Sequence, residues 1–420
     1  MIVGAAQVEI TPAPGRELSG FAARTQPAVG VLDPLLARAL YLADGPERLL
    51  WVHVDLIGLE RDFVTEFRQW AAARYGLAPA QVMLSATHTH SGPPTIHLQE
   101  AGTYDASYVT SLSTRLQQVA SAALAQPEEC QVIRVEGHCD LAIDRRRRPS
   151  AHTDPRVAAV GWRRADGTFA AVLTNYAMHG VALGAGNRQI SADVPGQVAH
   201  AVTRQLPGRP VALVTNGACA NLNPPAENVP FSQIQAWGEQ IAGAVVPALR
   251  RAAPEPGAGL RVRARIVPLP IERLSLEEIE AAARRALDEE SAFPEWGARY
   301  RRAVEKWRQT MSQAVRDGTA SDTREVELSA VRIGGALFLG LNAEVFSTFT
   351  DQVRSAAGGA AYTVGYANGL LGYLPTAAAY DEGGYEVETA HYFYNSFRVR
   401  RAGFELVVQH AAALAREMVP

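Results

Sequence analysis

The chain has 420 residues, 47% of them apolar and 20% charged, so it can bury a large core and is neither disordered nor fibrous in composition. Its 40 basic and 43 acidic residues give a formal net charge of −3, without the basic excess expected of a nucleic-acid-binding protein. We therefore expect a small-molecule or amphiphilic substrate and no nucleic-acid partner.

The N-terminal stretch, residues 1–15, does not combine a basic segment with an apolar one as a secretory signal does. No later stretch reaches the 18 or so apolar residues of a membrane span. We therefore expect a cytoplasmic protein without a transmembrane segment. Its cysteines, Cys130, Cys139 and Cys219, lack CxxC spacing, so a thiolate zinc site is not indicated and any metal must be held by histidine or oxygen ligands.

The first half of the chain alternates short β-branched runs with amphipathic helical patterns, which is typical of an α/β fold. We expect mixed sheets flanked by helices, with functional residues at the strand ends. The expected strands cover residues 49–59, 81–86, 170–178 and 210–217, and the expected helices cover 61–76 and 193–206.

In the second half, highly charged helical patterns cover residues 275–290 and 295–315, and Ser275 with Glu278 fits a capping box. We interpret residues 271–320 as a helical insertion, either a packing buttress or a lid, and favour the buttress because most surface helices only pack. A strand pattern follows over 326–344, and a helix is expected over 403–418. We see no internal repeat and no low-complexity linker, which favours one domain over residues 1–420.

Two histidines stand two residues apart in "SATHTHSGP", residues 85–93, directly after an apolar run. In an extended strand, residues i and i+2 point to the same side, so His88 and His90 would face one site at the strand's end. The alternative is a pair of ordinary surface histidines. This motif alone does not decide between them.

His179 in "LTNYAMHG" and Glu344 in "ALFLGLNAEVF" also follow buried strand patterns. A lone histidine after a strand is more often a core or loop residue, but His179 arrives in the same structural position as His88. A carboxylate after an apolar run is costly to bury unless a cation receives it, although Glu344 could instead begin a helix over 344–357. Two histidines and a glutamate from different strands are a credible zinc site with an open position for water.

A run of four arginines follows the apolar residues 141–143 in "IDRRRRP". Such a run is usually a solvated surface. However, Arg145 comes directly after the apolar segment and could point inward to bind an anionic group or a developing oxyanion.

Taken together, these motifs resemble the catalytic domain of the neutral/alkaline, non-lysosomal ceramidases, zinc amidases that split an N-acyl sphingosine into fatty acid and amine. The resemblance covers most of residues 1 to about 400 and rests on the order of several motifs rather than on any one. They are "GAAQVEITP", "SATHTHSGP", the arginine after "LAID", "NYAMHG" followed by "SADVPG", "NGACANLNP", "GLNAEVF" and "ANGLLGYLPT".

The resemblance implies roles for individual residues. It implies a zinc ligand set of His88, His179, Glu344 and, through its phenolic oxygen, Tyr373. Tyr373 could equally be a catalytic hydrogen-bond donor to the tetrahedral intermediate. His90 becomes a histidine that supports the ligands or a catalytic one, rather than a ligand, and Arg145 becomes the partner of the carbonyl oxygen or its oxyanion, while metal-bound water attacks the acyl carbon.

The chain departs from the family in the substrate-binding stretch. Ceramidases carry a "GDVSPN"-like segment whose serine contacts the primary hydroxyl of the substrate, but residues 220–224 here read "ANLNP". Asn221 and Asn223 can still bind a polar head group. The immunoglobulin-like C-terminal domain of the family is also missing from these 420 residues, so a small or amphiphilic N-acyl substrate is expected rather than membrane-embedded ceramide.

The sequence therefore predicts a zinc-dependent amidohydrolase of the neutral ceramidase type, acting on carbon–nitrogen bonds other than peptide bonds, with a role in lipid metabolism if the acyl chain is long. One alternative keeps the site and changes the bond, giving a metal-dependent esterase, deacetylase or carbohydrate-active hydrolase. A non-catalytic binding protein is a third hypothesis, which the presence of all the ligand candidates argues against.

Overall fold

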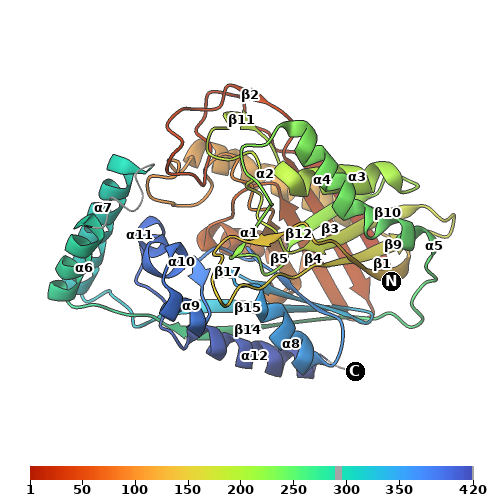
Figure 1. The fold of residues 1–420 in the computed structure, drawn as a ribbon. Coiled ribbons are helices and arrows are strands. Elements are labelled where there is room, and N and C mark those ends of the chain that lie inside the picture. Colours follow the sequence, from red (N-terminus) through yellow and green to blue (C-terminus); the bar gives the residue numbers. More distant parts are fainter. Residues whose placement is uncertain (289–295, 419–420) are drawn as a thin grey trace.

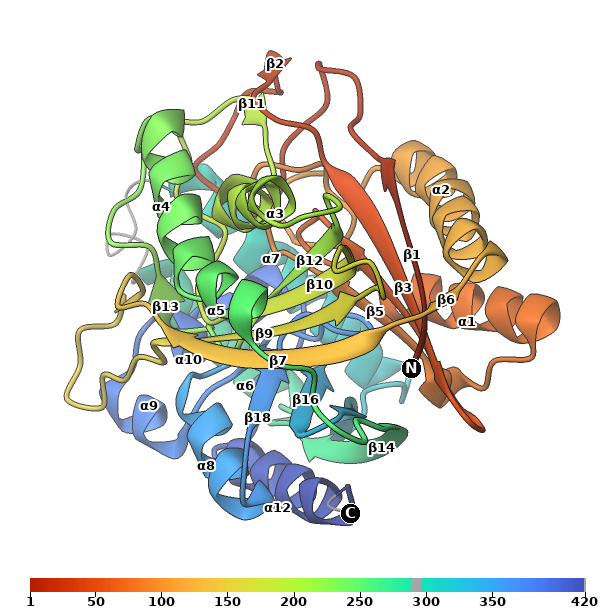
Figure 2. The same cartoon turned by 90° about the vertical axis from the view of Figure 1, so that its right-hand side faces the viewer.

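Three mixed sheets form the body of the protein in the computed structural model, which describes residues 1–288 and 296–418 (Figures 1 and 2). The first has the order β5-β4-β3-β1-β6, with β1 (Ile2–Glu9), β3 (Leu36–Asp44), β4 (Glu47–Val54), β5 (Val82–Ala86) and β6 (Glu128–Glu129). The second is β12-β10-β9-β7, with β7 (Gln131–His138), β9 (Arg156–Arg163), β10 (Phe169–Tyr176) and β12 (Val211–Asn216). The third is β14-β15-β16-β18, with β14 (Leu260–Pro270), β15 (Thr323–Ile333), β16 (Ala336–Leu341) and β18 (Ala361–Val364). The predicted α/β class with mixed sheets flanked by helices is confirmed.

The same chain path builds each of these sheets. Three strands pair antiparallel in succession, and a helix then leads to a fourth strand that pairs parallel to the third. The crossover helices are α1 (Arg61–Tyr75), α3 (Asp193–Gln205) and α8 (Thr348–Ala357). The sequence shows no internal repeat, but the three units share this topology, while residues 10–35, 139–155 and 271–322, between their first and second strands, differ in length and content.

The parallel strands β5, β12 and β18 meet where the three units come together. Gly365 donates its backbone N–H to the Asn216 carbonyl at 3.0 Å, and Ala86 donates to the Tyr366 carbonyl at 3.2 Å. The Asn216 side chain also donates to the Thr87 carbonyl at 2.7 Å. These bonds satisfy edges that would otherwise be unpaired. They also bring the carboxyl ends of the three strands to one place.

Helices cover the outer faces of the sheets (Figures 1 and 2). The helix α2 (Ala106–Ala125) packs on β1 and β3, α4 (Phe231–Gly243) packs on α3 and precedes α5 (Val246–Arg251), and α12 (Gly403–Glu417) packs on α8. The predicted helices over 61–76, 193–206 and 403–418 are all present. The expected strand over 326–344 is interrupted, because Gly334, with φ of 55°, turns the chain between β15 and β16.

The predicted helical pair is present as α6 (Leu276–Asp288) and α7 (Gly297–Arg316), while the part of the prediction that falls on 289–295 lies outside the described residues. The capping box is confirmed, since Ser275 N–H donates to Glu278 Oε2 at 2.7 Å and Glu278 N–H to Ser275 Oγ at 3.2 Å. Tyr300 and Trp307 of α7 pack against α11 (Ala390–Phe393), which follows α10 (Tyr385–Glu388). Close packing of this kind favours the buttress.

Short elements connect the units near their strand ends. They are the pairs β2 (Gly30–Val31) with β11 (Gln189–Ile190), β8 (Ile143–Asp144) with β13 (Leu222–Asn223), and β17 (Glu344–Val345) with β19 (Tyr373–Leu374), together with η1 (Pro79–Gln81) and α9 (Ala377–Glu382). Among the residues described, no helix is long and apolar enough to cross a membrane.

Candidate metal centre and adjoining cavity

Three buried side chains, one from each unit, converge where the central strands end. His88 follows β5, His179 follows β10 and Glu344 follows β16. They are 2%, 1% and 1% exposed, and one ligand atom from each lies within 4.8 Å of the others. The strand-end site predicted from the sequence is therefore formed by residues 91 and 165 positions apart in the chain.

His88 reaches the centre by a route other than the predicted one. The strand β5 ends at Ala86, and His88 has a left-handed φ of 56°, so it does not share an extended strand with His90. Its Nδ1 lies 2.6 Å from the Ile57 carbonyl, which directs Nε2 toward Glu344 Oε2 at 3.6 Å. A ring nitrogen fixed by a backbone carbonyl leaves the other free for a metal.

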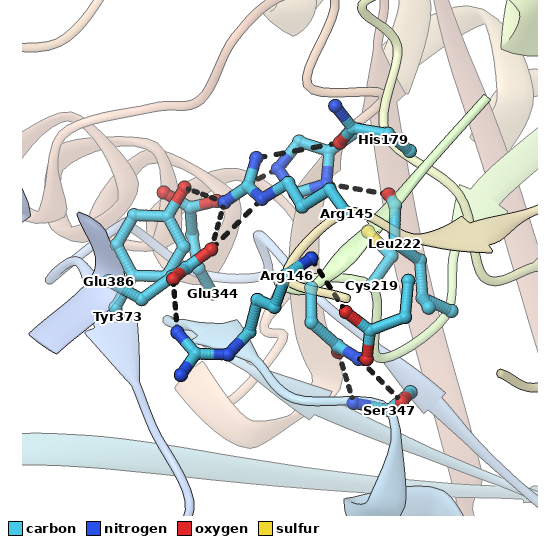
Figure 3. Close-up of polar contacts among 12 residues, drawn as sticks. Arg145, Arg146, His179, Cys219, Leu222, Glu344, Ser347, Tyr373 and Glu386 are labelled. Atoms are coloured by element: carbon cyan, nitrogen blue, oxygen red, sulfur yellow. Dashed lines mark hydrogen bonds and ion pairs between the residues drawn. The ribbon is translucent and has the colours of Figure 1, made fainter. Parts of the chain in front are cut away.

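His179 and Glu344 face each other directly (Figure 3). His179 Nδ1 lies 3.1 Å from the Leu222 carbonyl, and its Nε2 lies 3.1 Å from Glu344 Oε2. Glu344 lies in β17, ahead of α8, so it is not in the first turn of that helix as the alternative required. Its Oε1 accepts a hydrogen bond from the Tyr394 hydroxyl at 2.5 Å, which orients the carboxylate.

The electrostatics of the three groups depend on one another. Burial lowers the pKa of His88 to about 4. Burial alone would raise the pKa of Glu344, but the two imidazoles outweigh it and lower that pKa to about 2. Burial also opposes protonation of His179, but Cys219 and Glu344 outweigh it and raise its pKa to about 9. A proton on His179 thus compensates the buried carboxylate.

This donor set fits a divalent transition-metal ion. Two imidazole nitrogens and one carboxylate oxygen are ligands that Zn²⁺ prefers, and a site with three protein ligands leaves a position open. The carbonyl and phenol partners of the ligand residues resemble those that orient metal ligands in proteins. The same donor set also accepts other first-row metals, so it does not distinguish among them.

His90 lies beside the three-residue group. Its Nε2 is 3.2 Å from His88 Nε2, and its buried Nδ1 has no hydrogen-bond partner among the described residues. The ring packs against Gly20, where an added Cβ would lie 2.3 Å from Nδ1, and Phe21 contacts it edge-on with centroids 4.8 Å apart. Burial, followed by the charges of His88 and His179, lowers the pKa of His90 well below its usual range, so its ring is neutral.

Arg145 and Tyr373 form a hydrogen-bonded pair (Figure 3). Arg145 Nη2 donates to the Tyr373 hydroxyl at 3.0 Å, and its Nε donates to Glu386 Oε1 at 2.9 Å. Tyr373 pairs with Glu344 in the β17–β19 bridge, which places it next to the ligand group. Burial raises the pKa of Tyr373 well above its usual range, so the phenol is neutral when no ion binds it.

The two asparagines of the "ANLNP" stretch have different surroundings. Asn223 faces the cavity beside the metal centre, accepts from Arg145 Nη1 at 3.4 Å and donates to Glu227 Oε1 at 2.9 Å. Asn221 lies in a separate pocket, where its amide donates to Asp144 Oδ2 at 2.7 Å and to Ser347 Oγ at 3.1 Å. It supports the loop that carries Arg145.

A cavity of about 450 Å³ opens beside these residues. Its apolar lining residues include Phe21, Ala22, Leu98, Ala101, Trp296 and Phe393. Its polar lining residues include Arg145, Arg146, Arg148, Asn223, Glu227 and Glu386. The volume is toward the small end of ligand sites, and a lining of both kinds suits an amphiphilic molecule.

Sequence reasoning missed several residues of the site. Tyr366 and Tyr394 contact the ligand group, Cys219 contacts both Tyr366 and His179, and Glu386 neutralises Arg145 and Arg146. Cys219 lies in the motif "NGACANLNP" and Tyr366 directly precedes "ANGLLGYLPT", and their position just after the strands β12 and β18 was the available signal. Tyr394 and Glu386 lie in short helical turns that carry no pattern.

Comparison with known proteins finds the same fold in solved ceramidases. The structure is similar to the neutral ceramidase from Pseudomonas aeruginosa, with 19% sequence identity, a TM-score of 0.74, and coverage of 100% of this chain and 75% of that one. A ceramidase complexed with C2 gives 17% identity, a TM-score of 0.75, and coverage of 100% and 76%. No family model matches the sequence. The resemblance to neutral ceramidases inferred from the motifs is thus confirmed for the fold.

Proposed function

We propose that the protein is a zinc-dependent hydrolase of the neutral ceramidase type that cleaves the amide bond of a small or amphiphilic N-acyl compound. The observation that carries this proposal is the meeting of His88, His179 and Glu344, one from each unit, beside a cavity lined by both apolar and polar residues. The ceramidase fold supports the same reaction class.

In this proposal His88, His179 and Glu344 hold the ion, and Tyr373 is the candidate for a fourth contact. Zn²⁺ bound at such a site supplies Lewis acidity and lowers the pKa of a water molecule toward neutrality. The protein's part is to hold the ligands, keep the site largely enclosed and present polar groups to the substrate.

Arg145 and Tyr373 are placed to bind the carbonyl oxygen of the substrate. The guanidinium and the phenol hydroxyl lie together at the cavity wall, so the guanidinium can donate to an oxygen as its negative charge develops, and the phenol can do so in the alternative in which it does not bind the ion. His90 also faces the cavity, so its ring is placed to accept a proton from the attacking water and return it to the leaving amine.

The lining residues offer contacts to both halves of the substrate. The acyl group can pack on Phe21, Leu98 and Trp296, and the amine half can hydrogen-bond Asn223. A volume of about 450 Å³ favours a short acyl chain over a full-length lipid.

A substrate panel tests the proposal against its alternatives. N-acyl amines, O-acyl esters and glycosides of matched size are offered to the protein and to the Glu344→Gln variant. The proposal predicts turnover of the N-acyl amines, lost in the variant. Turnover of esters or glycosides alone would establish an esterase or glycosidase on this site, and no turnover with tight binding would favour a binding protein.

A further inference from the structure

Two side chains that the reaction does not use occupy positions related to that of His88. His88 comes two residues after β5, Tyr366 two residues after β18, and Cys219 three residues after β12. Since β5, β12 and β18 are the parallel strands that meet at the centre, a similar turn of chain in each unit brings these side chains inward. The fold thus delivers a phenol and a thiol to the metal centre in addition to its ligands.

Tyr366 contacts every member of the ligand group. The side chain is 2% exposed, and its ring stacks on the His88 imidazole with centroids 4.0 Å apart and planes 9° apart. Its hydroxyl lies 3.2 Å from His179 Nε2 and 3.4 Å from Glu344 Oε2. One side chain therefore restrains all three ligand residues.

The backbone conformation also sets this residue apart. Tyr366 and His88, whose rings stack, both have a left-handed φ of 56°. A bulky residue rarely adopts this conformation, and such strain persists where surrounding contacts hold it, often at functional sites. Cys219 Sγ lies 3.3 Å from the Tyr366 hydroxyl, beside His179, and limits the rotation of that hydroxyl.

We infer that Tyr366 is a positioning residue of the metal centre and that Cys219 fixes the direction of its hydroxyl. This inference rests on the proposed metal site but concerns residues outside the ligand set. The hydroxyl touches both His179 Nε2 and Glu344 Oε2, which are 3.1 Å apart, and so holds them together for the ion. Tyr373 has a different task, because its hydroxyl is bonded by Arg145.

The test compares metal affinity in Tyr366→Phe and in a matched control. The Phe variant keeps the ring and its stack on His88 and removes only the hydroxyl. Removing a hydrogen-bond partner of a metal ligand typically lowers metal affinity by about 10–100-fold, so the Zn²⁺ dissociation constant of Tyr366→Phe should rise by about that factor. Tyr108→Phe removes another buried hydroxyl, which donates to the Ile10 carbonyl at 2.7 Å, and should leave it unchanged.

The measurement is competition with a chelator of known affinity, made on the full-length chain, and is independent of any substrate. Cys219→Ala leaves the phenol in place, so it should raise the Zn²⁺ dissociation constant by a smaller factor than Tyr366→Phe. If Tyr366→Phe folds poorly, a Zn²⁺ dissociation constant for Cys219→Ala within twofold of wild type would contradict the inference. A Zn²⁺ dissociation constant for Tyr366→Phe within twofold of wild type would overturn the inference. A wild-type chain that binds no Zn²⁺ would refute the metal centre itself, whereas a wild-type chain that binds Zn²⁺ with the same dissociation constant as Tyr366→Phe would refute the positioning role alone.

Discussion

Gly20 provides a steric test of the role of His90. Replacing it with alanine would place a Cβ 2.3 Å from His90 Nδ1 and 2.5 Å from its Cγ, where carbon contacts are normally about 3.5–4.0 Å. The imidazole must therefore move by about 1 Å, a displacement that can cost about 100-fold in rate at a catalytic group. We expect Gly20→Ala to lose about that factor in N-acyl hydrolysis while its Zn²⁺ affinity stays within a few-fold of wild type.

The control is Gly15→Ala in the same segment. Gly15 has φ of 100° and Gly20 φ of 95°, so both variants impose backbone strain of about 1–3 kcal/mol, but no atom lies within 4 Å of a Cβ at position 15. Thermal unfolding should show similar destabilisation in both, and initial-rate assays should show the activity loss in Gly20→Ala only. Equal activity in the two variants would refute a catalytic role for His90.

Further predictions concern pH, the oxyanion and the acyl chain. The pKa of His179 is raised to about 9, so an ion must displace its proton, and Zn²⁺ affinity measured by chelator competition should fall about tenfold per pH unit below that value. The proton on His179 also stabilises the metal-free fold. This contribution to the free energy of unfolding is present in full below about pH 6.5, the pKa of histidine in the unfolded chain, and is lost as pH rises through about 9, which urea unfolding at several pH values can follow. Arg145→Lys keeps a charge but loses the planar donor group, so kcat should fall about 100-fold or more in steady-state assays with bound zinc retained. Trp296→Ala enlarges the cavity beside its apolar lining residues, so kcat/KM for longer acyl chains should rise by up to about fourfold per methylene newly buried. An unchanged dependence of kcat/KM on acyl-chain length would contradict the placement of the acyl group against these residues.

The sequence predicted the site residues that directly follow buried strands. His179 and Glu344 could be nominated because a polar residue after a buried apolar run must find a partner, and the structure brings them 3.1 Å apart. His88 and His90 were expected to lie near each other as neighbours on one face of an extended strand. Their ring nitrogens are indeed 3.2 Å apart, but His88 has a positive φ and lies outside the strand, a backbone conformation that residue spacing does not reveal.

The remaining features depend on contacts between distant segments. The threefold repetition is one of topology, with no shared residue pattern, so no periodicity in the sequence exposes it. Gly20 and Trp296 reach the cavity only because the segments between the first and second strands of two units fold over the same side. Their roles follow from packing and could not be assigned from neighbours in the chain.

Metal analysis of the purified protein tests the central claim most directly. Zinc is measured by mass spectrometry in wild type and in His88→Ala and Glu344→Ala, each prepared without chelators and checked for folding by circular dichroism. The proposed site predicts about one zinc per wild-type chain and loss of most of it in both variants, because each removes one of three buried ligands. Little zinc in folded wild type, or unchanged zinc in both variants, would contradict it.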